Sequence, residues 1–195
     1  LLGKDGAHMP KKKPYVVGIA GGTCSGKSTL AQKIQDSLPD VRVAQINMDR
    51  YFKKVTPNTV APITRKTYVE HNHPDSFELD RFYADFDAAI APDSGNELVV
   101  VEGLLILYLD HIRDALDFKV FVDLKSDERI VRRIVKFMAR GQSFEEVTER
   151  YLDTVRFRHD ELIEPTRWHA DLVLNGNLER HQGVEALLCY LRAHL

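Results

Sequence analysis

Short apolar runs alternate with helix-forming segments along most of the chain. The runs predict five strands, at residues 15–20, 41–47, 98–101, 118–124 and 170–174. Segments of good helix formers, several with apolar residues every three or four positions, predict helices at about 27–38, 77–91, 126–140 and 183–193, and a short one within 104–116. Strands that alternate with helices are typical of a parallel sheet with helices on both faces. The pattern therefore predicts a doubly wound α/β fold.

Capping and turn signals refine this outline. Ser126 is expected to cap the helix that it starts, because Asp127 and Glu128 follow it and negative charge is favoured in a first turn. Ser143 and Glu146 have the spacing of a capping box, which predicts one more helix. Residues 53–75 contain prolines and mostly polar side chains between two predicted elements. We expect a long irregular loop there, and loops of this length in compact domains are often functional.

A glycine-rich segment with the pattern G-x-x-x-x-G-K-S follows the first predicted strand. It consists of Gly21, Gly22, Thr23, Cys24, Ser25, Gly26, Lys27 and Ser28, with Thr29 next in the helix. Glycines let the backbone curl so that N–H groups point at phosphate oxygens, and the following helix directs its positive end at the same anion. Lys27 can reach the β- and γ-phosphates, and the Ser28 hydroxyl can ligate Mg²⁺. A glycine-rich turn that binds nothing is the alternative, but a strand before and a helix after favour a P-loop that binds ATP.

Two carboxylates follow predicted strands and are expected near the phosphates. Asp49 comes just after the second strand, and Glu102 ends the third. Ligands of open α/β sheets bind beyond the carboxyl ends of the strands. Asp49 is therefore a candidate general base or Mg²⁺ ligand, and Glu102 a candidate Mg²⁺ ligand through water. The alternative for each is a carboxylate that only caps a turn, although a lone carboxylate beside an apolar strand is costly to bury.

The predicted helix at 126–140 separates its charges from its apolar residues. The cations Arg129, Arg133, Lys136 and Arg140 fall within roughly a 60° wedge at about 100° per residue. Ile130, Ile134, Phe137 and Met138 lie on the opposite side, which we expect to pack. Phosphoryl transfer needs cations on the transferring group, often supplied by a mobile lid. The pattern indicates a cationic lid, with a solvated basic face as the alternative.

Composition narrows the function classes. The formal net charge of −2 gives no sign of a nucleic-acid or membrane surface, and no apolar run reaches the ~20 residues of a membrane helix. Cys24 and Cys189 make no disulfide framework, so a reducing cytoplasm is expected. Residues 1–9 look like an expression remnant. Residues 10–195 are expected to form a single domain, with the lid at about 126–160.

Several segments, in the same order, resemble the uridine kinase and phosphoribulokinase family of P-loop kinases. Besides the P-loop they are Asp49-Arg50-Tyr51-Phe52-Lys53, His73-Pro74-Asp75-Ser76-Phe77, Glu102-Gly103-Leu104-Leu105, Phe121-Val122-Asp123, Arg132-Arg133, Arg140-Gly141 and Ala170-Asp171. The resemblance covers almost everything from Tyr15 onward. It implies ATP-dependent phosphorylation of a ribose 5′-hydroxyl or a similar alcohol. Asp49 would be the base, Ser28 and Glu102 would serve Mg²⁺, and Arg133 and Arg140 would belong to the lid.

The chain also departs from this family at the acceptor side. Uridine-cytidine kinases have an Asp that binds the ribose hydroxyls at the position of Asn72 in this chain. They have an Arg at the position of Gln142 and a Gln at the position of Arg150. Residues 77–102 are too few to include the hairpin with which those enzymes read the pyrimidine. The resemblance therefore carries over the kinase scaffold and leaves the acceptor open.

Together these features predict an ATP-dependent kinase that phosphorylates a hydroxyl of a small metabolite. A nucleoside is the leading acceptor class. The alternative acceptors are another ribosyl compound, such as nicotinamide riboside, or a sugar phosphate. The alternative function is that of a regulatory module that binds ATP without turnover. The expected catalytic residues are Asp49, Lys27, Arg133 and Arg140, the metal ligands Ser28, Glu102 and Asp49, and the acceptor ligands Arg65, Asn72 and Asp75. Whether the chain forms a homo-oligomer is left open.

Overall fold

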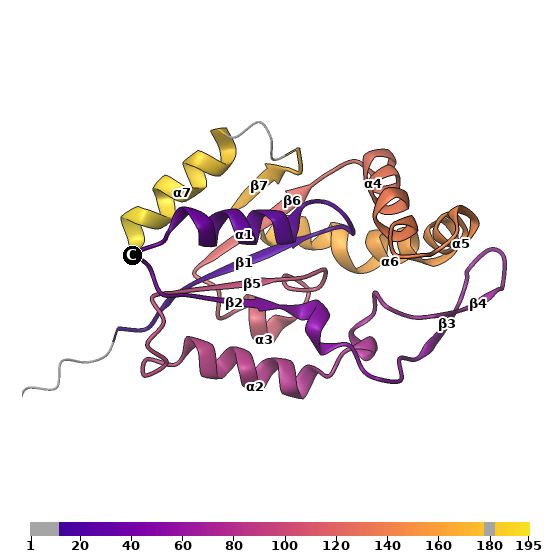
Figure 1. The fold of residues 1–195 in the computed structure, drawn as a ribbon. Coiled ribbons are helices and arrows are strands. Elements are labelled where there is room, and N and C mark those ends of the chain that lie inside the picture. The colour runs from indigo at the N-terminus through magenta and orange to yellow at the C-terminus, as the bar shows by residue number, and fades with distance from the viewer. Residues whose placement is uncertain (1–11, 178–181) are drawn as a thin grey trace, which may run out of the picture.

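A five-stranded parallel sheet lies at the centre of the molecule (Figure 1). Its strands lie in the order β2 (Val43–Asn47), β5 (Leu98–Glu102), β1 (Tyr15–Gly21), β6 (Phe118–Asp123) and β7 (Leu172–Asn175). The computed structural model describes residues 12–177 and 182–195. The expected expression remnant at 1–9 lies outside the described residues. The doubly wound α/β fold predicted from the sequence is confirmed.

Helices cover both faces of the sheet. On one face lie α1 (Lys27–Ser37) and α7 (Gln182–His194), and on the other α2 (Leu79–Ile90) and the short α3 (Asp110–Arg113) (Figure 1). All five residues of β5 are buried. Side chains of a strand point alternately to the two faces. Val99 and Val101 accordingly pack in the core beneath α2, while Leu98 and Val100 pack beneath α1 and α7. A strand buried on both faces explains the continuous apolar run at this position.

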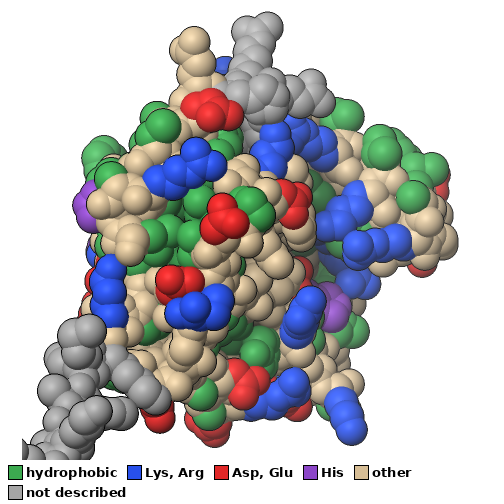
Figure 2. Space-filling model, turned by 60° about the vertical axis from the view of Figure 1, so that its left-hand side comes forward, with side chains coloured by type: hydrophobic (Ala, Val, Ile, Leu, Met, Phe, Trp, Pro, Cys, Tyr) green, Lys and Arg blue, Asp and Glu red, His purple; other side chains and the backbone are tan. Residues whose placement is uncertain are grey.

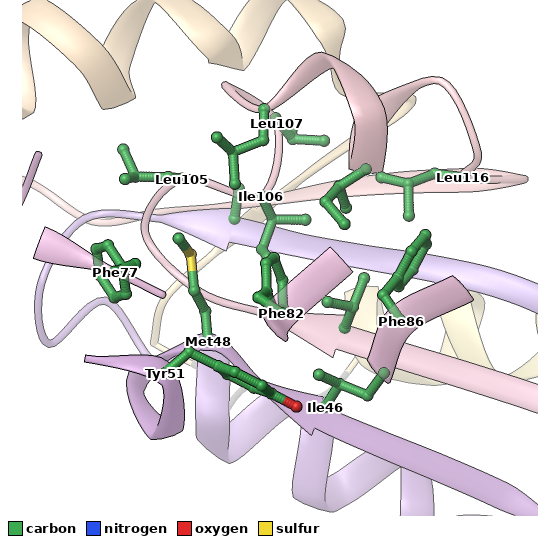
Figure 3. Packing of buried hydrophobic residues seen from close by; sticks show 14 of the residues in the cluster. Ile46, Met48, Tyr51, Phe77, Phe82, Phe86, Leu105, Ile106, Leu107 and Leu116 are labelled. Atoms are coloured by element: carbon green, nitrogen blue, oxygen red, sulfur yellow. The ribbon is translucent and has the colours of Figure 1, made fainter. Parts of the chain in front are cut away.

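The core on the α2 side anchors the segment that carries Asp49. Phe82 and Phe86 of α2 are fully buried there, next to Met48 and Tyr51 of the 3₁₀ turn Met48–Tyr51 (Figure 3). Tyr51 also donates a hydrogen bond from its hydroxyl to Asp85 Oδ2, at 2.9 Å. The turn that follows β2 is thus fixed from both sides of Asp49.

A smaller layer lies at one end of the molecule, beyond the carboxyl ends of the strands (Figure 1). It contains α4 (Ser126–Met138), α5 (Phe144–Arg150), α6 (Arg156–Arg158) and the π-helical turns Tyr151–Val155 and His159–Ile163. The two-stranded antiparallel hairpin of β3 (Asn58–Val60) and β4 (Thr67–Val69) lies beside them. Two short 3₁₀ helices, Pro74–Ser76 and Glu164–His169, connect this layer to the sheet.

Two local predictions are wrong. Residues 53–75 are not an irregular loop throughout, because β3 and β4 pair within them. Ser126 is the first helical residue of α4 rather than its cap, and Lys125 occupies the cap position without a side-chain hydrogen bond. By contrast, the short helix expected within 104–116 is confirmed by the four residues of α3. The capping box of Ser143 and Glu146 is also confirmed, since each side chain bonds the backbone N–H of the other residue.

The register of the sheet brings the functional candidates to one edge. Asn47 at the end of β2 pairs with Glu102 at the end of β5, and Gly21 at the end of β1 pairs with Val122 of β6. Since all five strands are parallel, these carboxyl ends meet on the side that faces the smaller layer. Among the described residues, none of the helices is both long and apolar enough to cross a membrane.

Candidate active site

The backbone of the glycine-rich segment curls as a phosphate-binding loop requires. Gly21 and Gly26 have φ angles of 144° and 108°, which side chains other than hydrogen rarely allow. A Cβ atom at Gly21 would collide with the carbonyl oxygen of Val122. The Lys27 ammonium donates a hydrogen bond to the carbonyl oxygen of Gly22, at 2.8 Å. The backbone of the loop therefore holds the Lys27 ammonium in place.

Ser28 and Glu102 meet beside this loop. The Ser28 hydroxyl donates to Glu102 Oε1 at 2.8 Å, and Glu102 is only 3% exposed. Burial raises the pKa of Glu102, and the charge of Lys27 and the bond from Ser28 oppose this. Burial likewise lowers the pKa of Lys27, while Glu102 and Asp49 raise it. A cation bound here would relieve the cost of burying this carboxylate.

The donors at this position fit Mg²⁺. A hydroxyl and a carboxylate are hard oxygen ligands, and Mg²⁺ in phosphoryl-transfer sites uses one or two such groups together with phosphate oxygens and water. In the part of the chain that the structure describes, no three His, Cys, Asp or Glu residues cluster as a cage of protein ligands. Ser28 and Glu102 therefore match a metal that is held mainly through the nucleotide.

Asp49 reaches the same space from β2. Its backbone N–H is held by Asn47 Oδ1 at 2.7 Å, which starts the 3₁₀ turn, and the residue is exposed. Asp49, Lys27, Ser28 and Glu102 all line one cavity of about 650 Å³. The structure thus brings together the base and metal-ligand candidates predicted from separate strands.

Cations dominate the cavity lining. Figure 2 shows Lys and Arg side chains gathered around the hollow on its right-hand side. The remaining lining residues come from four places: the phosphate loop and α1, the lid helices, the segment after β2, and the turn after β5. They are Thr23, Cys24, Gly26, Thr29, Phe52, Lys53, Lys54, Thr56, Val69, His71, Asn72, Leu104, Arg132, Arg133, Lys136, Phe137, Arg140, Gln142, Arg150, Thr154 and Val155.

The helix α4 buries two of its cations, Arg129 and Arg133, against the rest of the protein. The side that was expected to pack is covered only in part: Ile130, Ile134 and Phe137 are half-buried, and Met138 is 47% exposed. The reason is its position: α4 lies over the phosphate loop and contributes no residue to either core cluster.

Arg133 and Arg140 both face the cavity. Arg133 Nη1 donates to Thr23 Oγ1 at 2.9 Å, and its guanidinium lies 4.3 Å from the centre of the Phe137 ring. Arg140 lies 5.5 Å from the same ring. Burial lowers the pKa of Arg133, and the charge of Arg150 acts in the same direction. Arg133 Nε is buried and has no hydrogen-bond partner among the described residues, which leaves a donor for an anionic ligand.

Comparison with known proteins agrees with this geometry. The model of the phosphoribulokinase / uridine kinase family matches residues 87–180. A uridine kinase from Chloroflexus aurantiacus is 31% identical over 93% of this chain and 96% of its own. The chain belongs to the phosphoribulokinase and uridine kinase family. It is an ATP-dependent phosphotransferase with a P-loop kinase fold, and this family generally uses Mg²⁺.

Solved structures support the fold of this family member. Phosphoribulokinase from Rhodobacter spheroides has a TM-score of 0.57 and 16% identity, with 85% of this chain and 73% of that chain covered. Shikimate kinase from Bacteroides thetaiotaomicron has a TM-score of 0.55 and 18% identity, with 92% and 97% covered. At these identities the likeness extends to the fold alone.

Only one of the three predicted acceptor ligands lies at the kinase cavity. Asn72 is buried and lines it. Asp75 is exposed and pairs with His73 Nδ1 at 3.3 Å, and Arg65 is exposed with a φ of 60° in the turn of the hairpin. Neither of the latter two lines the cavity. The sequence did not predict the hairpin of β3 and β4, and this hairpin carries Arg65 away from the cavity.

An ion pair between the buried Glu70 and the half-buried Arg158 positions Asn72. Glu70, also 3% exposed, accepts hydrogen bonds from the backbone N–H groups of His71 and Asn72, at 2.9 and 2.8 Å. Arg158 Nε donates to its other oxygen at 2.8 Å. Burial opposes the charge of Glu70, yet Arg158 and the two N–H groups hold its pKa below the usual 4.5. Glu70 thus fixes the segment that presents His71 and Asn72 to the cavity.

The lid helices also hold the hairpin. Asp153 Oδ2 accepts hydrogen bonds from the Thr64 and Tyr68 hydroxyls, at 2.7 and 2.6 Å. Lys66 pairs with Glu149 at 2.8 Å. The hairpin, α5 and the π-helical turns therefore form one connected unit over the cavity.

Several cavity residues were missed by the sequence reasoning. They are Lys53, Lys54, His71 and Thr154, and Arg150, which was noticed only as a departure from related kinases. The sequence offered one signal for the two lysines, since Lys53 ends the segment that starts with Asp49 and Lys54 follows it.

Proposed function

We propose that this chain transfers the γ-phosphoryl group of ATP to a hydroxyl of a small ribosyl compound, with Asp49 as the general base. The observation that carries the proposal is the position of Asp49 across one cavity from Lys27, Ser28 and Glu102. A kinase for an alcohol needs a carboxylate within reach of the attacking hydroxyl and cations around the transferred group.

Each residue then has a distinct task. Asp49 orients the acceptor hydroxyl and takes its proton as the bond to phosphorus forms. The backbone N–H groups of the loop and Lys27 hold the β- and γ-phosphates, and Arg133 and Arg140 offset the charge that spreads over the transferring oxygens. Ser28 and Glu102 would hold Mg²⁺, which would neutralise part of the charge of the phosphates. The lid helices exclude water from the cavity.

The acceptor is the open part of this proposal. The name of the Chloroflexus relative makes a nucleoside the first class to test, and Asn72 is the buried amide that is available to its ribose hydroxyls. A ribosyl compound with an anionic group is the second class, and the cation-rich lining favours it.

The test is Mg²⁺-dependent release of ADP from ATP with a panel of nucleosides, nicotinamide riboside and sugar phosphates. Wild type is compared with Asp49→Asn, and with Asp36→Asn as a control that removes an exposed carboxylate from α1. We expect one acceptor class to stimulate ADP release. Asp49→Asn should lower kcat by about 10²-fold or more while MgATP binding is kept. If MgATP binds but no acceptor stimulates release, or if Asp49→Asn is as active as Asp36→Asn, the catalytic assignment is wrong.

A further inference from the structure

Lys53, Lys54 and Arg150 line the cavity, and within the described part of the chain none of them forms an ion pair. From the positions of Lys53, Lys54 and Arg150 we infer that the acceptor carries a phosphate or carboxylate group, and that these three cations bind it. We call the three residues the anion subsite. The inference rests on the proposed kinase function and narrows its acceptor to an anionic alcohol.

The first argument is the charge of the lining. Eight Lys and Arg side chains line the cavity against two carboxylates, Asp49 and Glu102, which leaves an excess of six positive charges. Glu102 bonds Ser28 at the phosphate loop, and the charges of both carboxylates act on Lys27. Since Mg²⁺ cancels part of the charge of ATP, the donor neutralises only part of this excess.

The second argument is that the cations of the anion subsite have no protein partner. Among residues 12–177 and 182–195, no carboxylate lies within ion-pairing distance of Lys53, Lys54 or Arg150. The neighbouring cations are paired: Lys66 binds Glu149, and Arg158 binds Glu70 and Glu161. Glu149 precedes Arg150 directly, yet it serves the hairpin and leaves Arg150 to the cavity.

The third argument is that like charges face one another there. After burial, which is the larger cause, the charge of Arg150 lowers the pKa of both His71 and Arg133. Arg150 and Arg133 both line the cavity, and their charges repel each other. A bound anion would turn this repulsion into two attractions.

His71 adds a neutral contact to this end of the cavity. Its ring meets the Phe52 ring edge to face, with centres 5.5 Å apart, and Glu70 holds its backbone N–H. A neutral imidazole held in one place can donate or accept a hydrogen bond without adding to the positive charge. The anion subsite thus combines a held imidazole with two exposed lysines, which suits a small phosphate or carboxylate.

Binding can be measured apart from turnover. With a non-hydrolysable ATP analogue and Mg²⁺ present, calorimetry would compare ribose with ribose 5-phosphate, and glycerol with glycerate. We expect the anionic member of at least one pair to bind tenfold or more tightly, and added salt to weaken that preference. Comparing phosphate with carboxylate identifies which group the anion subsite prefers.

Variants then assign the effect to the subsite. Arg150→Gln should weaken binding of the anionic compound about 10- to 100-fold, the range of a lost charged hydrogen bond, and leave MgATP binding unchanged. Arg150→Lys should keep part of the preference. Arg42→Gln serves as the control, because it removes one positive charge from an exposed pair with Glu97 that lies outside the cavity.

The outcomes separate this inference from the kinase proposal. If neutral ribosyl compounds bind and react as well as anionic ones, or if Arg150→Gln weakens MgATP instead, the inference is overturned and the kinase proposal stands. If the anionic compounds bind through Arg150 but no acceptor stimulates ADP release, the subsite is supported and the kinase assignment fails.

Discussion

Replacing Glu70 by Gln should lower the free energy of unfolding by about 2–4 kcal/mol. Gln keeps the size of the side chain but turns one of its oxygens into an NH₂ group. One of the three bonds, those from Arg158 and from the N–H groups of His71 and Asn72, is then lost. Breaking a buried ion pair from one side costs about 3–5 kcal/mol. Arg158 keeps its bond to Glu161, so the expected loss of about 2–4 kcal/mol lies at or below the lower end of this general range.

A second ion pair in the same region is the natural control. Lys66 and Glu149 are joined at 2.8 Å, the distance of the Glu70–Arg158 pair, but each of their side chains is 55% exposed. Exposed pairs contribute about 0–1 kcal/mol, because solvent screens them. Glu149→Gln should therefore cost less than about 1 kcal/mol. Burial, not distance, decides the difference.

Urea unfolding at pH 7 measures both variants, with equal m-values as the condition for comparing them. The double variant Glu70→Gln with Arg158→Met should recover about 1 kcal/mol or more relative to the sum of the single variants. The folded pKa of Glu70 lies below 4.5, so its contribution is present above that pH and is lost as the pH falls through the folded value. The difference in free energy of unfolding between wild type and Glu70→Gln should therefore become smaller as the pH is lowered below 4.5.

Two results would refute this reasoning. One is a loss in Glu149→Gln as large as that in Glu70→Gln. The other is a Glu70→Gln variant within about 0.5 kcal/mol of wild type, the scatter of a neutral surface change. Glu70→Gln should also raise KM for the acceptor more than KM for ATP, because Glu70 positions Asn72 and touches no part of the phosphate loop.

Two further predictions concern buried groups around the phosphate loop. Burial, with the charges of Arg129 and Lys27, lowers the pKa of His159 from 6.5 to about 4, so the unfolded chain is protonated first. The free energy of unfolding should then fall by on the order of 3 kcal/mol as the pH drops from about 6.5 to about 4. In a series of unfolding curves over this pH range, His159→Gln should lose less stability than wild type. An equal loss in both proteins would contradict this. A Cβ at Gly22 would lie 2.6 Å from Arg129 Nη1, and Arg129 is buried and held by the Leu124 carbonyl oxygen. Gly22→Ala should therefore weaken MgATP binding about tenfold or more by calorimetry, while Gly95→Ala, with open space around its Cβ, should bind as wild type does.

The sequence alone predicted what depends on neighbours along the chain. The phosphate loop needs glycines at positions of positive φ, and Gly21 and Gly26 have them. The strands were predicted because a strand covered on both faces is a continuous apolar run, as β5 is up to the Glu102 at its carboxyl end. The edge that collects Lys27, Asp49 and Glu102 also followed from the sequence, since parallel strands present their carboxyl ends together.

Only the tertiary structure decided which cations and amides face the cavity. Arg65 and Arg150 are both arginines near predicted loops or helix ends, but a hairpin turn carries Arg65 away while the end of α5 places Arg150 in the lining. The decision rests on partners far apart in sequence, such as Lys66 with Glu149 and Glu70 with Arg158. Likewise α4 has an apolar and a cationic side, and its periodicity cannot say which side will be covered. That depends on what lies beneath the helix, and here it is the phosphate loop.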